Sequence, residues 1–327
     1  MTGLRYNVPF MDSDFQAKLY SNILQRTGEY HVNQRMSIQV AHVRRVYNRR
    51  YHRLYIENLA SLMRVLRFGL TFSRLKQRAL QNCLDIRVVE RTVKFAELPE
   101  SFNGYRILHL SDTHLDLHPA LTPAILECLA PLEYDLAVLS GDYRASTYGS
   151  YQAAMLETEK VIQALKAPSL GVLGNHDFLE FVPYLESYGV KMLLNETIRL
   201  ERAGQVIYLS GVDDPHFYEV DDLQRARSSI PQAGFSILLA HSPEIYREAA
   251  ACGYQLMLCG HTHAGQICLP GRIPFIINAD CPRSKAVCAW EHAGMLGYTS
   301  PGTGTSGVPA RFFCPPEITI HVLTNSP

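Results

Sequence analysis

Aspartate, asparagine and histidine side chains follow several short apolar runs in this chain. Five runs end in residues that could bind a cation or move a proton: Asp112 and His114, Asp142, Asn175 and His176, His241, and His261 and His263. Carboxylate and amide oxygens with imidazole nitrogens suit Mn, Fe or Zn, and no cysteine is among them. One such residue after a strand is ordinarily a turn or cap. Five in series are hard to explain as solvated turns, so the pattern predicts a metal site.

The spacing within these motifs has a chemical reason. Asp112 and His114 are two residues apart, so in an extended turn both side chains point the same way, and His261 and His263 repeat this arrangement. Asp142 stands alone, and its two carboxylate oxygens could bridge two cations. Two metal ions can stabilise the attacking and leaving oxygens of an in-line displacement at phosphorus.

The elements that must position these residues alternate between strand and helix. The apolar runs predict strands that end at each motif, and the segments between them have a helical pattern. The expected strands are 105–110, 134–140, 169–173, 235–240 and 254–259, with helices near 119–130, 150–166 and 178–188. Alternation implies a parallel-type α/β sheet covered on both faces. The carboxyl ends of such strands converge on one crevice, where ligands bind.

The remaining segments are less regular. Further strands are expected at 85–95, 191–194, 197–202, 206–212 and 317–323, and the segment 265–327 is rich in Gly and Pro. Residues 1–35 are polar and mixed, which predicts mostly loop with one helix near 14–26. Residues 38–80 have helical periodicity, divided near Gly69.

The ordered set of motifs resembles the calcineurin-like metallophosphoesterase family. The motifs are Asp112-Thr113-His114, Gly141-Asp142, Gly174-Asn175-His176-Asp177, Ala240-His241-Ser242-Pro243 and Gly260-His261-Thr262-His263. The resemblance covers roughly residues 85–327. It implies a four-layer α/β sandwich, in which two mixed β-sheets lie between helices, preceded here by a basic helical extension. It also implies two divalent metal ions, with Mn favoured and Zn or Fe as alternatives.

The resemblance also assigns roles to the motif residues. It places Asp112, His114 and His263 on one metal and Asn175, His241 and His261 on the other. It makes Asp142 the bridge and sets Asn175 and His176 beside the phosphate, with His176 as the catalytic residue that protonates the leaving oxygen or stabilises the transition state. Asp177 is expected to orient His176.

The late segments resemble a branch of small bacterial phosphodiesterases that includes some UDP-diacylglucosamine pyrophosphatases. That branch suggests hydrolysis of a lipid-linked diphosphate such as UDP-2,3-diacylglucosamine, in lipid A synthesis. Arg144 and His118 are the expected headgroup contacts, although each could equally be solvated or a helix cap, and the turns at Arg272 and Arg311 are further options. A soluble nucleotide or cyclic-nucleotide phosphodiesterase and a non-catalytic scaffold are the alternatives.

Charge is balanced overall but unevenly distributed. The 327 residues have a formal net charge of zero, which gives no global field toward a polyanion. Residues 41–80, however, hold ten basic residues against one acid, Glu57, a net charge of +9. Two regions follow: a basic amphipathic helical region at 1–83 and a catalytic domain at 84–327.

The basic region has three readings. It could bind an anionic membrane surface through residues 41–80, or pack on the acidic remainder of the protein, and nucleic-acid binding is the least favoured. The eight scattered cysteines fit reduced thiols, and no apolar run reaches the ~18 residues of a spanning helix. The expected location is therefore cytoplasmic, at the inner face of the membrane.

Overall fold

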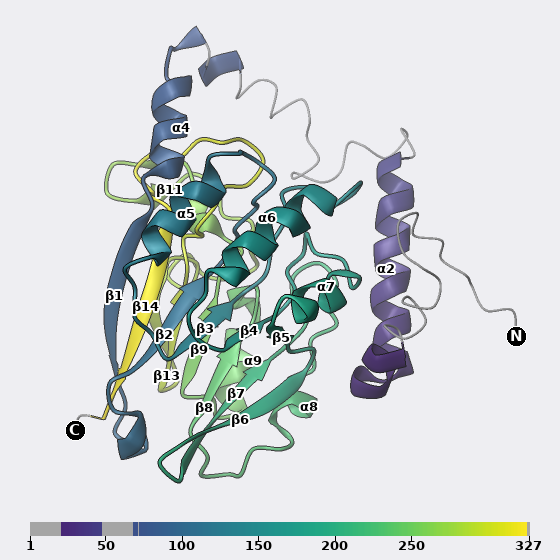
Figure 1. Ribbon diagram of the computed structural model, residues 1–327, viewed down its shortest axis with the longest axis vertical. Coiled ribbons are helices and arrows are strands. Elements are labelled where there is room, and N and C mark those ends of the chain that lie inside the picture. The colour runs from purple at the N-terminus through teal and green to yellow at the C-terminus, as the bar shows by residue number, and fades with distance from the viewer. Residues whose placement is uncertain (1–20, 48–67, 71, 326–327) are drawn as a thin grey trace, which may run out of the picture.

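The first of two large sheets carries most of the predicted parallel strands. The computed structural model describes residues 21–47, 68–70 and 72–325 (Figure 1). The sheet has the order β1-β14-β2-β3-β4-β5. Its strands are β1 (Arg87–Lys94), β14 (Glu317–Thr324), β2 (Tyr105–Leu110), β3 (Leu136–Leu139), β4 (Ser169–Gly171) and β5 (Val190–Met192). β2 to β5 are mutually parallel, whereas β14 pairs antiparallel with β2. The last described strand, β14, therefore lies between β1 and β2, beside the strand that leads to the first motif.

The second sheet carries the two remaining histidine motifs and has the order β12-β13-β9-β8-β7-β6. Its strands are β12 (Cys288–His292), β13 (Met295–Thr299), β9 (Leu256–Cys259), β8 (Ser236–Leu239), β7 (Gln205–Gly211) and β6 (Glu196–Arg202). β13, β9, β8 and β7 are parallel, and both edge strands are antiparallel. A short hairpin, β10 (Cys268–Leu269) with β11 (Ile273–Pro274), stands apart from both sheets.

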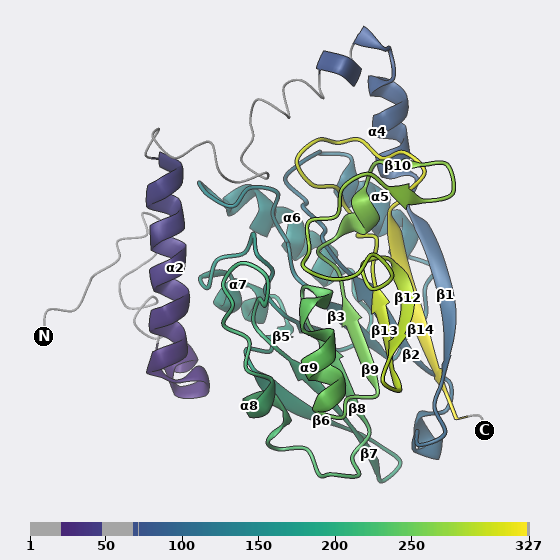
Figure 2. The ribbon, with the colours of Figure 1, turned by 180° about the vertical axis from the view of Figure 1, so that it is seen from behind.

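Along each sheet, apolar side chains point alternately into the core between the two sheets and into a core under the covering helices. On β3, Leu136 and Val138 face the core between the sheets, whereas Ala137 and Leu139 face the helices. The inner core also takes Ile237 and Leu239 from β8. Helices α5 (Leu121–Leu129), α6 (Gln152–Gln163) and α7 (Phe181–Ser187) cover the first sheet, and α8 (Leu223–Arg227) and α9 (Tyr246–Ala251) cover the second (Figure 2). The predicted four-layer α/β sandwich is confirmed.

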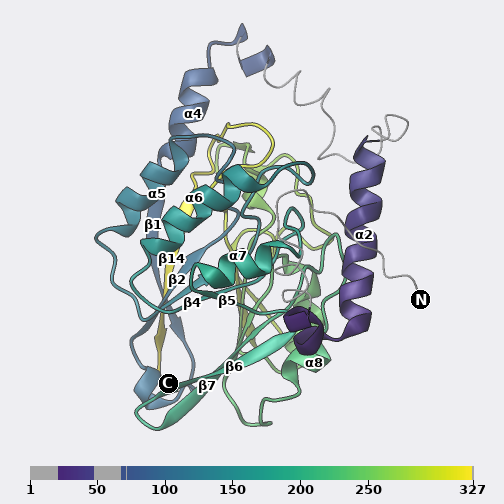
Figure 3. The same ribbon diagram turned by 45° about the vertical axis from the view of Figure 1, so that its right-hand side comes forward.

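The N-terminal helix α2 (Glu29–Tyr47) packs on this sandwich beside α7 and α8 (Figure 3). Val32 and Met36 are buried in the same core as α7, and Val43 packs against it. Just before it, Arg26 forms ion pairs of 2.7 Å with Glu186 and Glu196. The expectation of mostly loop over residues 1–35 was wrong for 29–35, because the buried face of α2 is partly polar and its apolar periodicity is weak.

The rest of the basic region is described only at its end. Positions 48–67, where most of the predicted apolar membrane face lies, are outside the described residues. Helix α4 (Lys76–Leu84) follows and contains the predicted boundary between residues 83 and 84. α4 rests on the late loop through Ala79, which is buried with Val308 and Ala310.

Candidate functional site

The strand ends bring the predicted ligand side chains together at the meeting of the two sheets. Three groups have ligand atoms within 4.8 Å of one another and are buried: Asp112 with His114 and His263, His114 with Asp142 and His176, and Asp142 with His241 and His261. Asn175 joins the last group, since its Oδ1 lies 2.9 Å from His241 Nε2 and 3.0 Å from His261 Nδ1. Asp142 belongs to two groups, which suits a bridging carboxylate.

Backbone carbonyls fix the orientation of three histidine rings. A carbonyl oxygen only accepts hydrogen bonds, so the ring nitrogen that faces it carries a hydrogen. His114 Nδ1 donates to Arg144 O at 2.6 Å, His241 Nδ1 to Ser140 O at 2.8 Å, and His261 Nε2 to Asn278 O at 2.5 Å. The second nitrogen of each ring then turns toward the cluster, which is the arrangement that metal-binding histidines adopt.

Electrostatics agrees with a cation in this position. His241 Nε2 faces three atoms that can accept a hydrogen bond: Asn175 Oδ1 at 2.9 Å, His261 Nδ1 at 3.3 Å and Asp142 Oδ2 at 3.4 Å. Although burial alone would lower it, Asp142 raises the pKa of His241 well above its usual value, so that a proton fills the place between them. A divalent cation would displace that proton. The donor set therefore fits the metal ions that the sequence predicts.

The backbone carries strain at the same positions. Asp112, His114, Asp142, His261 and His263 have φ between 40° and 70°, a region that non-glycine residues rarely adopt. Asp112 and His114 thus reach the cluster through a left-handed turn and not through the extended turn expected from their spacing. Strained residues concentrate at functional sites, where the surrounding structure holds them in place.

Two glycines make room for the ligands. A Cβ atom on Gly174 would lie 2.3 Å from Asp142 Oδ1, and one on Gly260 would lie 1.8 Å from Ser111 Oγ and 2.3 Å from Asp112 Oδ2. Gly174 therefore allows the chain to approach the Asp142 carboxylate closely, in addition to the predicted turn.

His176 lies at the edge of the cluster with one nitrogen held. Its Nδ1 donates to Ala145 O at 2.9 Å, and its Nε2 lies 3.8 Å from Asp142 Oδ2. Its backbone N–H donates to Asp142 Oδ1 at 2.9 Å. Burial lowers the pKa of His176 to about 4. The ring is therefore neutral at pH 7 and presents Nε2 toward the Asp142 carboxylate.

Comparison with known proteins agrees with this geometry. Residues 105–265 match the model of the calcineurin-like phosphoesterases. The chain is 28% identical to the metallophosphoesterase YkuE of Bacillus subtilis over 253 residues, 74% of this chain and 86% of that protein. This chain contains a calcineurin-like metallophosphoesterase domain. The domain places it among the metal-dependent phosphoester hydrolases.

Other relatives are longer or more distant. A zebrafish protein named transmembrane protein with metallophosphoesterase domain is 31% identical over 258 residues, 72% of this chain but 57% of its own length. Among solved structures, the NAD nucleotidase of Haemophilus influenzae is 14% identical with a TM-score of 0.41, covering 61% of this chain and 45% of that one.

Asp177 ties two motif turns of the phosphoesterase domain together. Its carboxylate accepts hydrogen bonds from the backbone N–H groups of Asp142 and Gly174, both at 2.8 Å, and of Tyr143 at 3.0 Å. It fixes the β3 turn against the β4 turn, which is a different contact from the expected one with the His176 ring.

The predicted headgroup contacts have internal partners. Arg144 is fully buried, donates from Nε to His176 O at 2.8 Å and stacks on Phe178 at 3.9 Å. His118 Nδ1 accepts from the N–H of Ala120 at 3.1 Å, in the turn just before α5. Arg311 is also buried and bonds the carbonyls of Pro301 and Gly304, whereas Arg272 is exposed on the hairpin. Arg144 supports the His176 turn, and its contact with substrate stays a prediction.

Two supporting groups are absent from the sequence prediction. Ser140 Oγ donates to Ser111 Oγ at 2.7 Å, and Ser111 Oγ donates to the Asp112 carboxylate. On the other side, the His216 ring lies tilted by 42° against the His261 ring, with centroids 4.0 Å apart, and His216 Nδ1 lies 3.0 Å from Glu244 Oε1. No local pattern marks these residues, but the serines that precede two aspartate motifs are a signal that could have been used.

Proposed function

We propose that this protein hydrolyses a phosphodiester or diphosphate bond with two divalent metal ions, of which Mn²⁺ is the first candidate and Zn²⁺ or Fe²⁺ are alternatives. One ion is assigned to Asp112, His114 and His263, and the other to Asn175, His241 and His261, with Asp142 between them. The observation that carries this proposal is the convergence of carboxylate oxygens and imidazole nitrogens around Asp142. A bound cation would compensate for burying these lone-pair atoms, which an apolar core cannot do.

The chain's own residues then have defined tasks. When bound, two cations lower the pKa of a water molecule and neutralise charge on the phosphoryl oxygens. Asn175 and His176 lie where the phosphate would sit. A bound anion next to His176 Nε2 favours protonation of the ring, which prepares it to give a proton to the leaving oxygen. Ala145 O holds the ring in that orientation.

The substrate that we propose is a lipid-linked diphosphate such as UDP-2,3-diacylglucosamine. In the basic segment the described cationic residues are all exposed: Arg44, Arg45, Arg74, Lys76 and Arg78. Exposed cations concentrated in one segment of a chain with no net charge favour a partner with anionic headgroups. No helix in the described part of the chain is long and apolar enough to cross a bilayer. The exposed cations lead us to propose attachment to the cytoplasmic face of the membrane by surface contact.

A hydrolysis screen with added Mn²⁺ tests this function. It compares UDP-2,3-diacylglucosamine, a phospholipid and bis(p-nitrophenyl) phosphate, each with and without liposomes. Release of UMP and a lipid phosphate is expected, together with complete loss of activity after chelation and recovery on re-addition of metal. Preference for a water-soluble diester would instead assign a nucleotide phosphodiesterase. Metal binding without hydrolysis of any of these substrates would exclude the proposed hydrolase and favour the non-catalytic scaffold.

A further inference from the structure

The β10–β11 hairpin exposes apolar side chains next to the metal site. Leu269, Ile273, Phe275 and Ile276 have exposed fractions of 44%, 52%, 58% and 59%. The hairpin begins five residues after His263, and the chain then returns to Asn278, whose carbonyl oxygen holds the ring of His261. The hairpin is therefore tied to the site at both ends, by the chain that leads from His263 and by the contact of Asn278 with His261.

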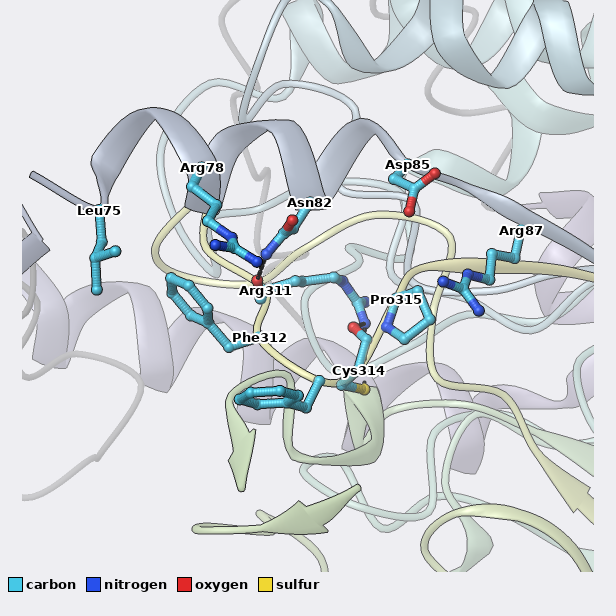
Figure 4. Close-up of a pocket in the computed structure, with 10 residues that line it drawn as sticks. Leu75, Arg78, Asn82, Asp85, Arg87, Arg311, Phe312, Cys314 and Pro315 are labelled. Carbon is cyan, nitrogen blue, oxygen red and sulfur yellow. Dashed lines mark hydrogen bonds between the residues drawn. The ribbon is translucent and has the colours of Figure 1, made fainter. Parts of the chain in front are cut away.

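A second exposed apolar group continues this surface toward α4. Phe313 is 57% exposed, and the residue before it, Phe312, pairs with Ile267 and accepts a hydrogen bond from Cys268 N at 2.9 Å. On the other side Phe313 and Leu75 line one pocket of about 390 Å³ between α4 and the late loop (Figure 4). Beyond Leu75, Phe72 and Phe68 are 81% and 72% exposed. Figures 1 and 2 show α4 and the hairpin at the same end of the molecule.

The charges on this surface are mostly positive. Residues 72–84 and 264–279 contain no aspartate or glutamate. They carry four exposed cations, Arg74, Lys76, Arg78 and Arg272. The pocket adds Arg87 and one carboxylate, Asp85. The chain as a whole is neutral, so this concentration of positive charge is local.

We propose that this surface docks on an anionic phospholipid membrane. It is defined by Phe68, Phe72, Leu75, Leu269, Ile273, Phe275, Ile276 and Phe313 with their four cations, and we call it the docking surface. Aromatic and aliphatic side chains enter the interface while arginine and lysine bind the headgroups. A second copy of this chain would place four cations against four, which like-charge repulsion opposes. The inference rests on the proposed function and deepens it, because docking there presents the site to a lipid-linked phosphate.

Vesicle sedimentation tests the surface without depending on catalysis. The full chain is mixed with vesicles of equal parts phosphatidylcholine and phosphatidylglycerol, and with vesicles of phosphatidylcholine alone. We expect binding to the anionic vesicles that weakens as NaCl is raised, since salt screens the headgroup contacts. The double variant Ile273→Ser/Phe275→Ser should lower the partition coefficient at least about tenfold, because two apolar side chains no longer enter the interface.

Controls separate docking from folding and from chemistry. Leu156 on α6 is 53% exposed and far from the hairpin in the chain, so Leu156→Ser should bind vesicles as the wild type does. The double variant should keep wild-type hydrolysis of bis(p-nitrophenyl) phosphate. Equal vesicle binding by the double variant and the wild type would overturn the docking surface. A wild-type dimer that becomes a monomer in the double variant would also overturn it. If instead the wild type docks but cleaves no diester, the proposed function fails and the docking surface stands.

Discussion

Arg35 on α2 donates a hydrogen bond to the carbonyl oxygen of Asp177, 142 residues later, with an Nη2–O distance of 3.1 Å. The same guanidinium lies 3.3 Å from Asp213 Oδ2 and stacks on the ring of Tyr218 at 3.1 Å. Gln39, one turn further, donates to Glu180 at 2.7 Å and accepts from the N–H of Leu179 at 3.1 Å. A helix outside the matched family segment thus holds the turn that carries His176.

Replacing Arg35 should damage stability and catalysis together. Arg35→Met leaves Asp213 buried beside His31 alone, and breaking a buried ion pair typically costs about 3–5 kcal/mol. The free energy of unfolding from urea titration measures this loss, and kcat should fall because the His176 turn loses a support. Arg44→Ala, at an exposed position of the same helix, is the control. The double variant Arg35→Met/Asp213→Leu should recover stability but not kcat. Full kcat in that variant would show that α2 does not position the turn.

His176→Ala should retain metal and lose turnover. The ring is outside the proposed ligand sets, and its Nε2 is the group assigned to proton transfer. Loss of a positioned acid typically slows a reaction by about 10²–10⁴-fold. Elemental analysis and kcat on bis(p-nitrophenyl) phosphate give the two readouts. Turnover at the wild-type rate in metal-loaded His176→Ala would remove His176 from the mechanism.

Asp142→Asn should weaken both metals. The carboxylate contacts both ligand groups, and the amide supplies one neutral oxygen in place of two charged ones. The affinity for both cations should fall by more than the roughly 10–100-fold that loss of an outer-shell partner costs. Isothermal titration with Mn²⁺ measures this loss, with Asp116→Asn as a control. Two tightly held ions in Asp142→Asn would exclude the bridging role.

The parts of this structure that local sequence predicts are the strands and the ligands at their ends. An apolar run such as 105–110 followed by Asp112 and His114 is readable without knowing its partners, because burial and ligand chemistry act within a few residues. Helix α2 is different. Its buried face carries Arg35, Gln39 and His42, whose hydrogen-bond partners lie 105 to 142 positions away. Hydrophobic periodicity contains no information on such contacts, and the strained φ angles of the ligands are likewise set by tertiary packing.

Gly260→Ala should disrupt the Asp112 side of the site. Its Cβ would lie 1.8 Å from Ser111 Oγ and 2.3 Å from Asp112 Oδ2, so the Ser111–Asp112 contact must open. We expect loss of one bound metal and of activity. The near-ultraviolet circular dichroism spectrum should stay that of the wild type, because the rest of the fold is unchanged. Gly69→Ala is the matched control, since a Cβ there meets no atom within 4 Å. Unchanged metal content in Gly260→Ala would show that the turn relaxes at no cost.

His109 and His321 should make the protein less stable as the pH falls. Burial lowers the pKa of His109 to about 3 and, with His109 and Arg91 nearby, lowers the pKa of His321 well below its usual value. The unfolded chain has histidine pKa values of about 6.5, so between pH 6.5 and the folded pKa the unfolded state binds more protons. The stability that the folded protein gains from keeping these rings neutral is therefore complete above about pH 6.5 and is lost toward acid, by about 2 kcal/mol for His109 at pH 5.

A variant separates these histidines from other titrating groups. In His109→Gln the amide can still donate to Ser140 Oγ, which His109 Nε2 contacts at 2.9 Å, but it does not titrate. Urea unfolding from pH 5 to 7.5, with EDTA present in every sample, should show a smaller slope of unfolding free energy against pH in this variant. Leu156→Ser, at an exposed and non-titrating position of α6, should keep the wild-type slope. Identical slopes in His109→Gln and wild type would mean that His109 does not stay neutral in the folded protein.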